Sequence, residues 1–457
     1  HQVKTRDLVC AVTSVLGIAA GALALSVVLR RRPEVDAPQL VLATGLFGAY
    51  CGTVSSVAGV PVGAFLGVPY ADPRTLRFAA PIPWYRGRQT HDNTAPAPGC
   101  AQATPNLGRN CAIFPAQQTG SNNDPQYDGR VLAALGDVVV VVPNWRLGVL
   151  GFLSLTRSDG APVNAGLLDQ AEALRWTARN VEFFGGNKSD LVVVGHGSGA
   201  SALGYHLMSG SGLRSVATIR RAVFMSESPM TRYPVYTDHQ KEEEGAILET
   251  DILAELFCTQ SSQNYSSLLE CLRSIPVETL LKKPPRALRE LPLFFPVLPV
   301  MWPRRTWKKL KRPQHGMDSD LAEHLLSDLL SVCPTRLFAE QLRAWGNTVH
   351  GYVLHQADAG RHGGRTPWNY AVQLLFGSSL VHASPPAEQE LSRHVIARWA
   401  HFFKTGEVKA EQYSTRDRHF VISMTPFSDG TLTWVPDLRR EACEKLRPHF
   451  QNFIGGG

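Results

Sequence analysis

A short apolar run leads directly into a glycine-rich turn near the middle of the chain. Residues 191–194 read LVVV, and residues 195–199 read GHGSG. Upstream, residues 167–184 carry apolar side chains near helical spacing, and residues 138–142 are all valine, which predicts a strand buried on both faces. Strand, helix, strand, glycine turn and helix in this order predict an α/β class with a parallel sheet flanked by helices.

Composition and charge exclude several functional classes. The chain has 457 residues, of which 44% are apolar, and its net charge of +7 is too small for this length to indicate nucleic acid binding. The 15 histidines include no HExxH pattern, and no CxxC pair occurs. We therefore expect no nucleic acid partner, no metal site and no cofactor.

The N-terminal region contains an uncharged stretch of 22 residues, 8–29, followed by three arginines at residues 30–32. At about 1.5 Å per residue, a helix of this length crosses a hydrocarbon core of about 30 Å. A signal peptide, which would make the protein secreted, is the alternative, but the stretch is long for one and lacks a clear cleavage site. We expect residues 1–36 to form a tail with a single transmembrane anchor, and residues 37–457 to form the main domain.

Residues 39–71 are also free of charge, but they do not favour a second membrane span. This stretch contains glycine at six positions, together with Pro61 and Pro69. Such frequent helix breakers predict short strands and turns.

Several further segments carry a family resemblance. They are 65–71 (FLGVPYA) with 76–78 (LRF), 144–153 (NWRLGVLGFL), 164–170 (NAGLLDQ) with 173–176 (ALRW), and 184–187 (FGGN), which precedes the turn at 195–199. Together they resemble the type-B carboxylesterase and cholinesterase family over most of the chain. The resemblance implies the α/β-hydrolase fold, with a central, mostly parallel sheet flanked by helices.

The resemblance also implies three disulfide bonds. The expected pairs are Cys100 with Cys111, Cys258 with Cys271, and Cys333 with Cys443. Cys10 lies in the predicted span and Cys51 has no counterpart in the family, so both are expected to be free thiols. Disulfides belong to oxidising compartments.

Two signals disagree about which side of a membrane the domain occupies. The arginines after the span favour a cytosolic domain, whereas the expected disulfides favour an extracellular one. Asn187 and Asn264 begin N-glycosylation sequons, NKS and NYS, which agree with the extracellular placement. We expect a single-pass membrane glycoprotein with its large domain outside the cell.

The position of the family's nucleophile is occupied by a glycine. Ester hydrolysis on this fold uses a serine at the centre of the turn between strand and helix, and here the central residue is Gly197. Ser198 follows it and is the one alternative nucleophile, but a shift of one residue around such a turn redirects the side chain. The sequence therefore predicts that no catalytic serine occupies this turn.

The other catalytic parts are also altered. The family's histidine lies eight residues before the Phe of a Phe-Gly pair, which places Trp368 there; His362, six residues upstream, is the alternative base. No HGGG motif for an oxyanion loop follows Cys111, and the family's acidic block is missing before residues 326–328 (LSD). Arg77, which faces a glutamate in the family, would face Arg109 instead.

These losses predict a pseudoenzyme, shortened by two internal blocks and similar to the non-catalytic, neuroligin-like members of the family. The expected function is cell adhesion or reception through an extracellular protein partner, since a fold can outlive its chemistry. Gly17 and Gly21 form a GxxxG pattern in the span, which allows a homodimer. The alternatives are an ester hydrolase that uses Ser198 and His362, and a truncated isoform of a carboxylesterase.

Overall fold

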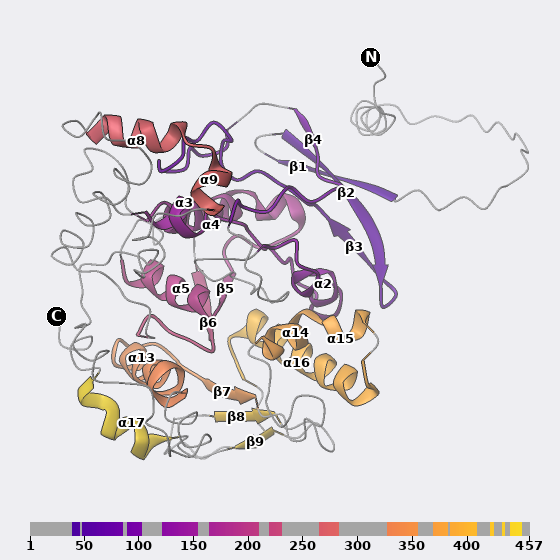
Figure 1. Cartoon of the computed structure of the whole chain (residues 1–457). Helices are drawn as coiled ribbons and strands as arrows, with labels where there is room; N and C mark the ends of the chain where they lie inside the picture. Colours follow the sequence, from indigo (N-terminus) through magenta and orange to yellow (C-terminus); the bar gives the residue numbers. More distant parts are fainter. Residues whose placement is uncertain are drawn as a thin grey trace, which may run out of the picture.

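The computed structural model describes thirteen stretches of the chain. They are residues 39–45, 48–85, 89–102, 121–153, 164–209, 219–230, 265–282, 327–354, 369–382, 384–408, 421–424, 432–434 and 439–449. The described strands lie in three separate sheets, and helices surround the middle one (Figure 1).

The first sheet is built from the uncharged residues that the sequence predicts to be short strands, and that prediction is confirmed. Strands β1 (Gln39–Gly45), β2 (Gly48–Val57) and β3 (Val60–Ala64) pair antiparallel in sequence order, and β4 (Thr90–Asp92) pairs parallel with β2. Ala58 and Gly59 both have positive φ, 50° and 81°, which gives the tight β2–β3 hairpin the twist it needs.

The middle sheet holds the predicted strand–turn–helix unit. Strand β5 (Leu191–His196) pairs parallel with β6 (Ile219–Met225), and α5 (Ser198–Met208) follows β5. Helix α4 (Ala165–Asn180) precedes β5 and continues into the 3₁₀ turn η2 (Val181–Phe184). The predicted helix and strand are therefore confirmed, and together they place the glycine turn at the carboxyl end of β5.

The all-valine run does not form the buried strand that its sequence predicts. Residues 138–142 are extended but belong to no strand, and they pair with none of the strands that the structure describes. Val138, Val140 and Val142 pack against the core, whereas Val139 and Val141 are 41% and 43% exposed. A strand needs a hydrogen-bonded neighbour and cover on both faces to be fully buried, and described residues provide cover on one face only.

The remaining described elements are mostly helices. They are η1 (Pro125–Tyr127), α2 (Arg130–Gly136), α3 (Gly148–Phe152), α8 (Tyr265–Ser274), α9 (Val277–Lys282), η4 (Asp328–Val332), α13 (Cys333–Ala344), α14 (Tyr370–Phe376), α15 (Ser378–Val381), α16 (Pro386–Thr405), α17 (Arg440–Leu446) and η5 (Arg447–His449). The third sheet contains β7 (Gly351–Leu354), β8 (Val421–Met424) and β9 (Leu432–Trp434). Helix α16 is amphipathic and ends at Gly406, whose φ of 77° stops the helix. Its apolar face joins α2, α14 and β6 in the main core.

One of the three expected disulfides is observed directly. Cys333 is bonded to Cys443, with the two Cα atoms 5.0 Å apart, and both side chains are buried. Cys271 is disulfide-bonded, while Cys258 lies outside the described residues.

Two expectations about cysteines are wrong. Cys51, expected to be free, is disulfide-bonded, and Cys100, expected to pair with Cys111, is a free thiol. Cys100 lies instead near the charged side chains of Arg146 and Asp169. A disulfide requires two cysteines that lie close together in space, which their order in the sequence does not show.

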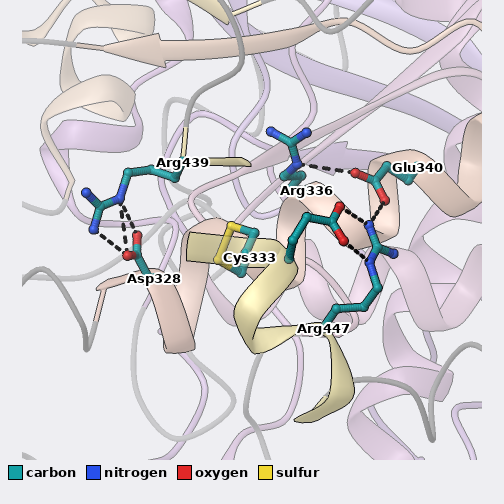
Figure 2. Close-up of a disulfide and its surroundings, with 8 residues drawn as sticks. Asp328, Cys333, Arg336, Glu340, Arg439 and Arg447 are labelled. Atoms are coloured by element: carbon teal, nitrogen blue, oxygen red, sulfur yellow. Dashed lines mark hydrogen bonds and ion pairs between the residues drawn. A yellow bond between two sulfur atoms is a disulfide. The ribbon is translucent and has the colours of Figure 1, made fainter. Parts of the chain in front are cut away.

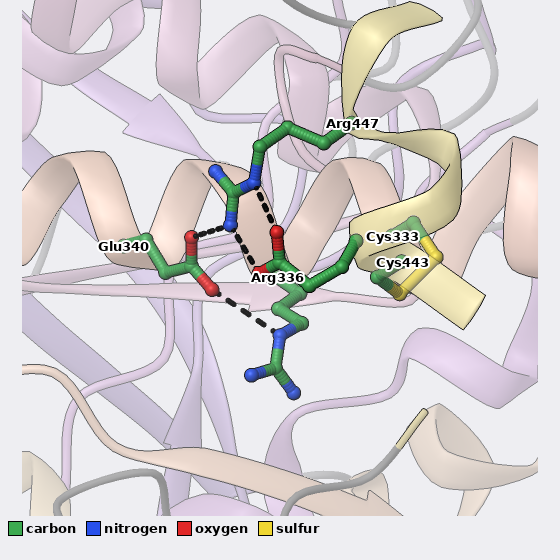
Figure 3. Close-up of polar contacts among 6 residues, drawn as sticks. Cys333, Arg336, Glu340, Cys443 and Arg447 are labelled. Atoms are coloured by element: carbon green, nitrogen blue, oxygen red, sulfur yellow. Dashed lines mark hydrogen bonds and ion pairs between the residues drawn. A yellow bond between two sulfur atoms is a disulfide. The ribbon is translucent and has the colours of Figure 1, made fainter. Parts of the chain in front are cut away.

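The Cys333–Cys443 bond lies within a set of charged contacts between η4–α13 and α17–η5, which we call the C-terminal clamp (Figure 2). Two ion pairs join these segments, Asp328 with Arg439 and Glu340 with Arg447. Two more lie within one segment each, Arg336 with Glu340 and Arg447 with Glu444. Figure 3 shows Arg447 and Arg336 both directed at Glu340, near the disulfide. The clamp thus joins segments that are about a hundred residues apart in the sequence.

The described residues bear only in part on the predictions about a membrane span and a metal site. None of the helices in the described stretches is long and apolar enough to span a bilayer, and residues 8–29 lie outside those stretches, so the anchor remains a prediction. Likewise, the described residues contain no cluster of three or more His, Cys, Asp or Glu side chains suited to a metal ion.

Candidate functional site

The turn between β5 and α5 has its unusual backbone at Gly197. This residue has φ 57° and ψ −131°, a conformation that a Cβ makes costly and that glycine adopts freely. Its N–H donates to the carbonyl oxygen of Met225 at the end of β6, over 2.9 Å. The turn is therefore fixed to the parallel strand beside it, and its central residue has no side-chain atom for chemistry.

Ser198, the alternative nucleophile, is the first residue of α5 and not the centre of the turn. It is only 2% exposed, and its Oγ has no hydrogen-bond partner among the described residues. A serine becomes a useful nucleophile when a neighbouring base removes its proton and a substrate can reach it. Within the described stretches, the Ser198 hydroxyl has no base within hydrogen-bond reach, and it has little exposure.

Small residues let α5 pack closely on the strands. A Cβ on Gly195 would lie 2.6 Å from the carbonyl oxygen of Gly199, and a Cβ on Gly204 would lie 2.4 Å from Pro229. Ser201, one turn into the helix, donates its buried hydroxyl to the carbonyl oxygen of Ser228 over 2.8 Å. The shape of the turn thus depends on backbone contacts on both sides of Gly197.

Burial weakens the titratable groups on α5 as acids or bases. His206 is buried and its Nε2 lies 3.0 Å from Oε1 of Gln170; burial, aided by the charge of Arg175, lowers the pKa of His206 to about 4. Burial, and then the carboxylate of Glu227, raise the pKa of Tyr205. His206 is eight positions beyond Ser198, which is about 12 Å along a helix, so it cannot serve as the base for that serine.

Most of the other predicted catalytic positions lie outside the described residues. Trp368, His362 and the oxyanion region after Cys111 are among them. Asn264, the second predicted glycosylation position, also lies outside the described residues. Asp328, next to the missing acidic block, is described, and its buried carboxylate pairs with Arg439 in the C-terminal clamp. This carboxylate therefore has a structural partner and is not held for a catalytic histidine.

The structure explains why two of the recognised motifs belong together, which the sequence did not reveal. Arg146 of the NWRLG segment binds Asp169 of the NAGLLDQ segment through two contacts of 2.6 and 2.7 Å. A Cβ on Gly151 or Gly166 would lie within 2.2 or 2.7 Å of the carbonyl oxygen of Arg146. The glycines of both motifs thus allow the two segments to lie close together, and the ion pair between Arg146 and Asp169 joins them.

Cys100 lies near this ion pair, and its thiol has low reactivity. Burial, together with the charge of Asp169 and against that of Arg146, raises the pKa of the Cys100 thiol to about 11. The reactive form of cysteine is the thiolate, so at neutral pH this thiol is protonated and unreactive.

Arg77 has partners other than the glutamate position that the resemblance suggested. Its guanidinium donates to the carbonyl oxygens of Ile275 and Arg273, at 2.7 and 2.5 Å, and Arg273 donates back to the carbonyl oxygen of Arg77 over 3.0 Å. Helix α8 ends at Ser274, so Arg77 binds the carbonyl end of that helix, where a cation is favoured. No sequence pattern indicated this contact, because it joins segments almost 200 residues apart.

Comparison with known proteins shows a similarity to one family. Residues 113–314, which include Gly197 and its turn, match the sequence model of the carboxylesterase family. Similarity to this family supports the α/β-hydrolase fold, and the parallel β5–β6 pair, with α5 following a strained glycine turn, agrees with it.

Several cholinesterases are similar to this chain. It is 32% identical to the cholinesterase of Mus musculus over 273 residues, covering 51% of this chain and 44% of that protein. It is 37% identical to cholinesterase 1 of Branchiostoma lanceolatum over 163 residues, covering 36% of this chain and 43% of that protein. It is 33% identical to the acetylcholinesterase of Danio rerio over 306 residues, covering 58% and 46%.

The chain spans less than half the length of each of these curated relatives. Their similarity therefore supports a carboxylesterase-family assignment, whereas their printed activities belong to longer proteins. A proposal about the activity of this chain therefore rests on its own residues at the turn between β5 and α5.

Proposed function

We propose that this carboxylesterase-family protein does not hydrolyse esters and acts as an extracellular protein-binding domain anchored in a membrane. The observation that carries the proposal is the geometry of the turn, where the strained position between β5 and α5 is Gly197. The backbone that presents a nucleophile is present, but the nucleophile is not.

The chemical argument concerns the first covalent step. A serine esterase forms an acyl-enzyme when a side-chain oxygen attacks the ester carbonyl. Gly197 has no such oxygen, and Ser198 is buried at the start of α5 without a hydrogen-bonded base. Trp368, at the family's histidine position, cannot accept a proton either.

The proposed location rests on the disulfides. Cys333–Cys443, together with the bonded states of Cys51 and Cys271, supports an oxidising compartment. The uncharged residues 8–29 would then be the anchor, with residues 37–457 outside the cell. Under this proposal, a rigid carboxylesterase-like scaffold binds a protein partner, and a homodimer through the anchor remains part of the proposal.

The direct test is covalent labelling. We expect the purified full chain to show no hydrolysis of aryl or choline esters above background and no covalent labelling by an organophosphate, because both reactions need an activated hydroxyl. An active cholinesterase run in parallel is the positive control. Stoichiometric labelling that disappears in Ser198→Ala would overturn the proposal and favour an esterase that uses Ser198 and His362.

Membrane attachment is tested separately. The full chain should remain in the membrane fraction after carbonate washing, and deletion of residues 8–29 should release it. Full-length protein in the washed soluble fraction would contradict the anchor but leave the catalytic argument unchanged.

A further inference from the structure

The turn that leads into β5 is exposed and carries one of the two sequons. Asn187, Lys188 and Ser189 are all exposed. The Oδ1 of Asn187 accepts a hydrogen bond from the backbone N–H of Ser189 over 2.9 Å, and the N–H of Asp190 donates to the carbonyl oxygen of Asn187 over 3.1 Å. The sequon thus forms a compact turn in which the asparagine amide and the serine lie side by side.

The residues around this turn hold it without using the side-chain nitrogen of Asn187. Gly185 and Gly186 donate to the carbonyl oxygens of Glu182 and Val181 on one side, and Arg221 pairs with Asp190 on the other. The side chain of Asn187 is exposed, and its Nδ2 makes no hydrogen bond within the described part of the chain. A group attached to Nδ2 would therefore displace no hydrogen bond of the described residues.

We propose that Asn187 is N-glycosylated, and that its glycan covers the end of β5 opposite Gly197. The proposal rests on the proposed function in one respect, which is passage of the domain through the secretory pathway. The amide Nδ2 of Asn187 forms a bond to C1 of the sugar of a lipid-linked oligosaccharide diphosphate. The bond from C1 to the phosphate oxygen breaks, the lipid diphosphate leaves with that electron pair, and the amide loses one proton, so no oxidant or reductant is needed.

The position of the turn determines which surface the glycan covers. Asn187 lies just before the amino end of β5, and Gly197 lies directly after its carboxyl end. A six-residue strand is about 20 Å long, so the two positions are on opposite ends of the middle sheet. The glycan leaves the glycine turn uncovered and excludes the Asn187 end of β5 from protein binding.

Secretory expression of the full chain tests the proposal. An Asn264→Gln background removes the second sequon, so any remaining N-glycan is on Asn187. We expect a gel-mobility shift in this background that a peptide N-glycosidase removes completely. The shift should be absent after Ser189→Ala and retained after Ser189→Thr, since threonine preserves the sequon and alanine does not.

Thiol alkylation of the same samples separates this proposal from the proposed function. Unglycosylated protein in which Cys333 and Cys443 are protected from alkylation would overturn glycosylation of Asn187 while leaving the extracellular location intact. Unglycosylated protein in which both cysteines are alkylated would overturn both. A shift that persists in Ser189→Ala would also contradict the assignment to Asn187.

Discussion

The glycine turn and the C-terminal clamp are both well-defined parts of the molecule, but different forces hold them. At the turn, α5 packs on β5 and β6 through glycines, buried serine hydroxyls and the hydrogen bond from Gly197 to Met225. At the clamp, a disulfide and several ion pairs join α13 to α17. One region depends on close backbone packing, and the other on side-chain cross-links.

The difference shows why the geometry of the glycine turn does not depend on a catalytic side chain. Backbone packing at Gly195 and Gly204 needs only the absence of side chains, so it does not depend on which residue occupies the centre of the turn. A nucleophile, in contrast, needs a base and an oxyanion site together. The packing of α5 on β5 can therefore stay the same whichever residue occupies the centre of the turn.

The largest expected effect is at the clamp. Replacing Cys333 and Cys443 together with alanine opens a link across 110 residues, and the loop-entropy estimate gives a loss of about 5 kcal/mol in the free energy of unfolding. Denaturant unfolding of the variant and the wild type measures it. Cys100→Ala is the matched control and should be much milder, because Cys100 is a free thiol. A loss below about 1 kcal/mol in the double variant would show that the ion pairs alone hold the clamp.

The next effect is a dependence of the unfolding free energy on pH, which arises from His206 on α5. The pKa of His206 falls to about 4 in the folded protein, against about 6.5 when unfolded. Below pH 6.5 the His206 imidazole binds a proton in the unfolded chain but not in the folded one. The free energy of unfolding therefore decreases as the pH falls towards 4, by about 3 kcal/mol in total. His206→Gln should flatten the dependence of the unfolding free energy on pH over this range.

The control for this measurement is His394→Gln, which alters an exposed histidine beside Glu390 on α16. It should leave most of the dependence between pH 6.5 and 4 in place. If His206→Gln and His394→Gln gave the same pH profile, burial of His206 would not be the origin of the acid sensitivity.

A smaller effect is expected from added bulk at the turn. Gly195→Ala would place a Cβ 2.6 Å from backbone atoms of Gly199 and Ala200, which must move, at a cost of about 2 kcal/mol. Gly63→Ala on β3 is the matched control, because its Cβ would meet atoms no closer than 3.5 Å. Thermal unfolding of both variants compares the sites, and equal melting temperatures would mean that α5 is not closely packed on β5.

Local sequence patterns predicted the elements whose environment is local. The strand at β5, the helix α4 before it and the short strands of the first sheet all follow from hydrophobic periodicity and from glycine and proline positions. The Cys333–Cys443 bond followed from the family resemblance. These features depend either on neighbours in the sequence or on a framework shared by the family.

The patterns were misleading where a distant partner decides the structure. Residues 138–142 have the composition of a buried strand, but a strand also needs a neighbour, and composition does not show whether one is present. Cys51 and Cys100 exchanged their expected states for the same reason. The contacts of Arg77 with the end of α8 join segments too far apart in the sequence for any periodic signal.

The smallest expected change in stability comes from the substitution that would seem to matter most for catalysis. Gly197→Ser restores a hydroxyl at the centre of the turn, where φ is 57° and ψ is −131°. A residue with a Cβ is strained there, so we expect a loss of about 1 kcal/mol in the free energy of unfolding. Ester hydrolysis and organophosphate labelling should both stay at background, because Trp368 offers no base and triad members act as a unit. Labelling of Gly197→Ser above the level of a Gly197→Ala control would show that a base and an oxyanion site are present, and that the nucleophile alone had been lost.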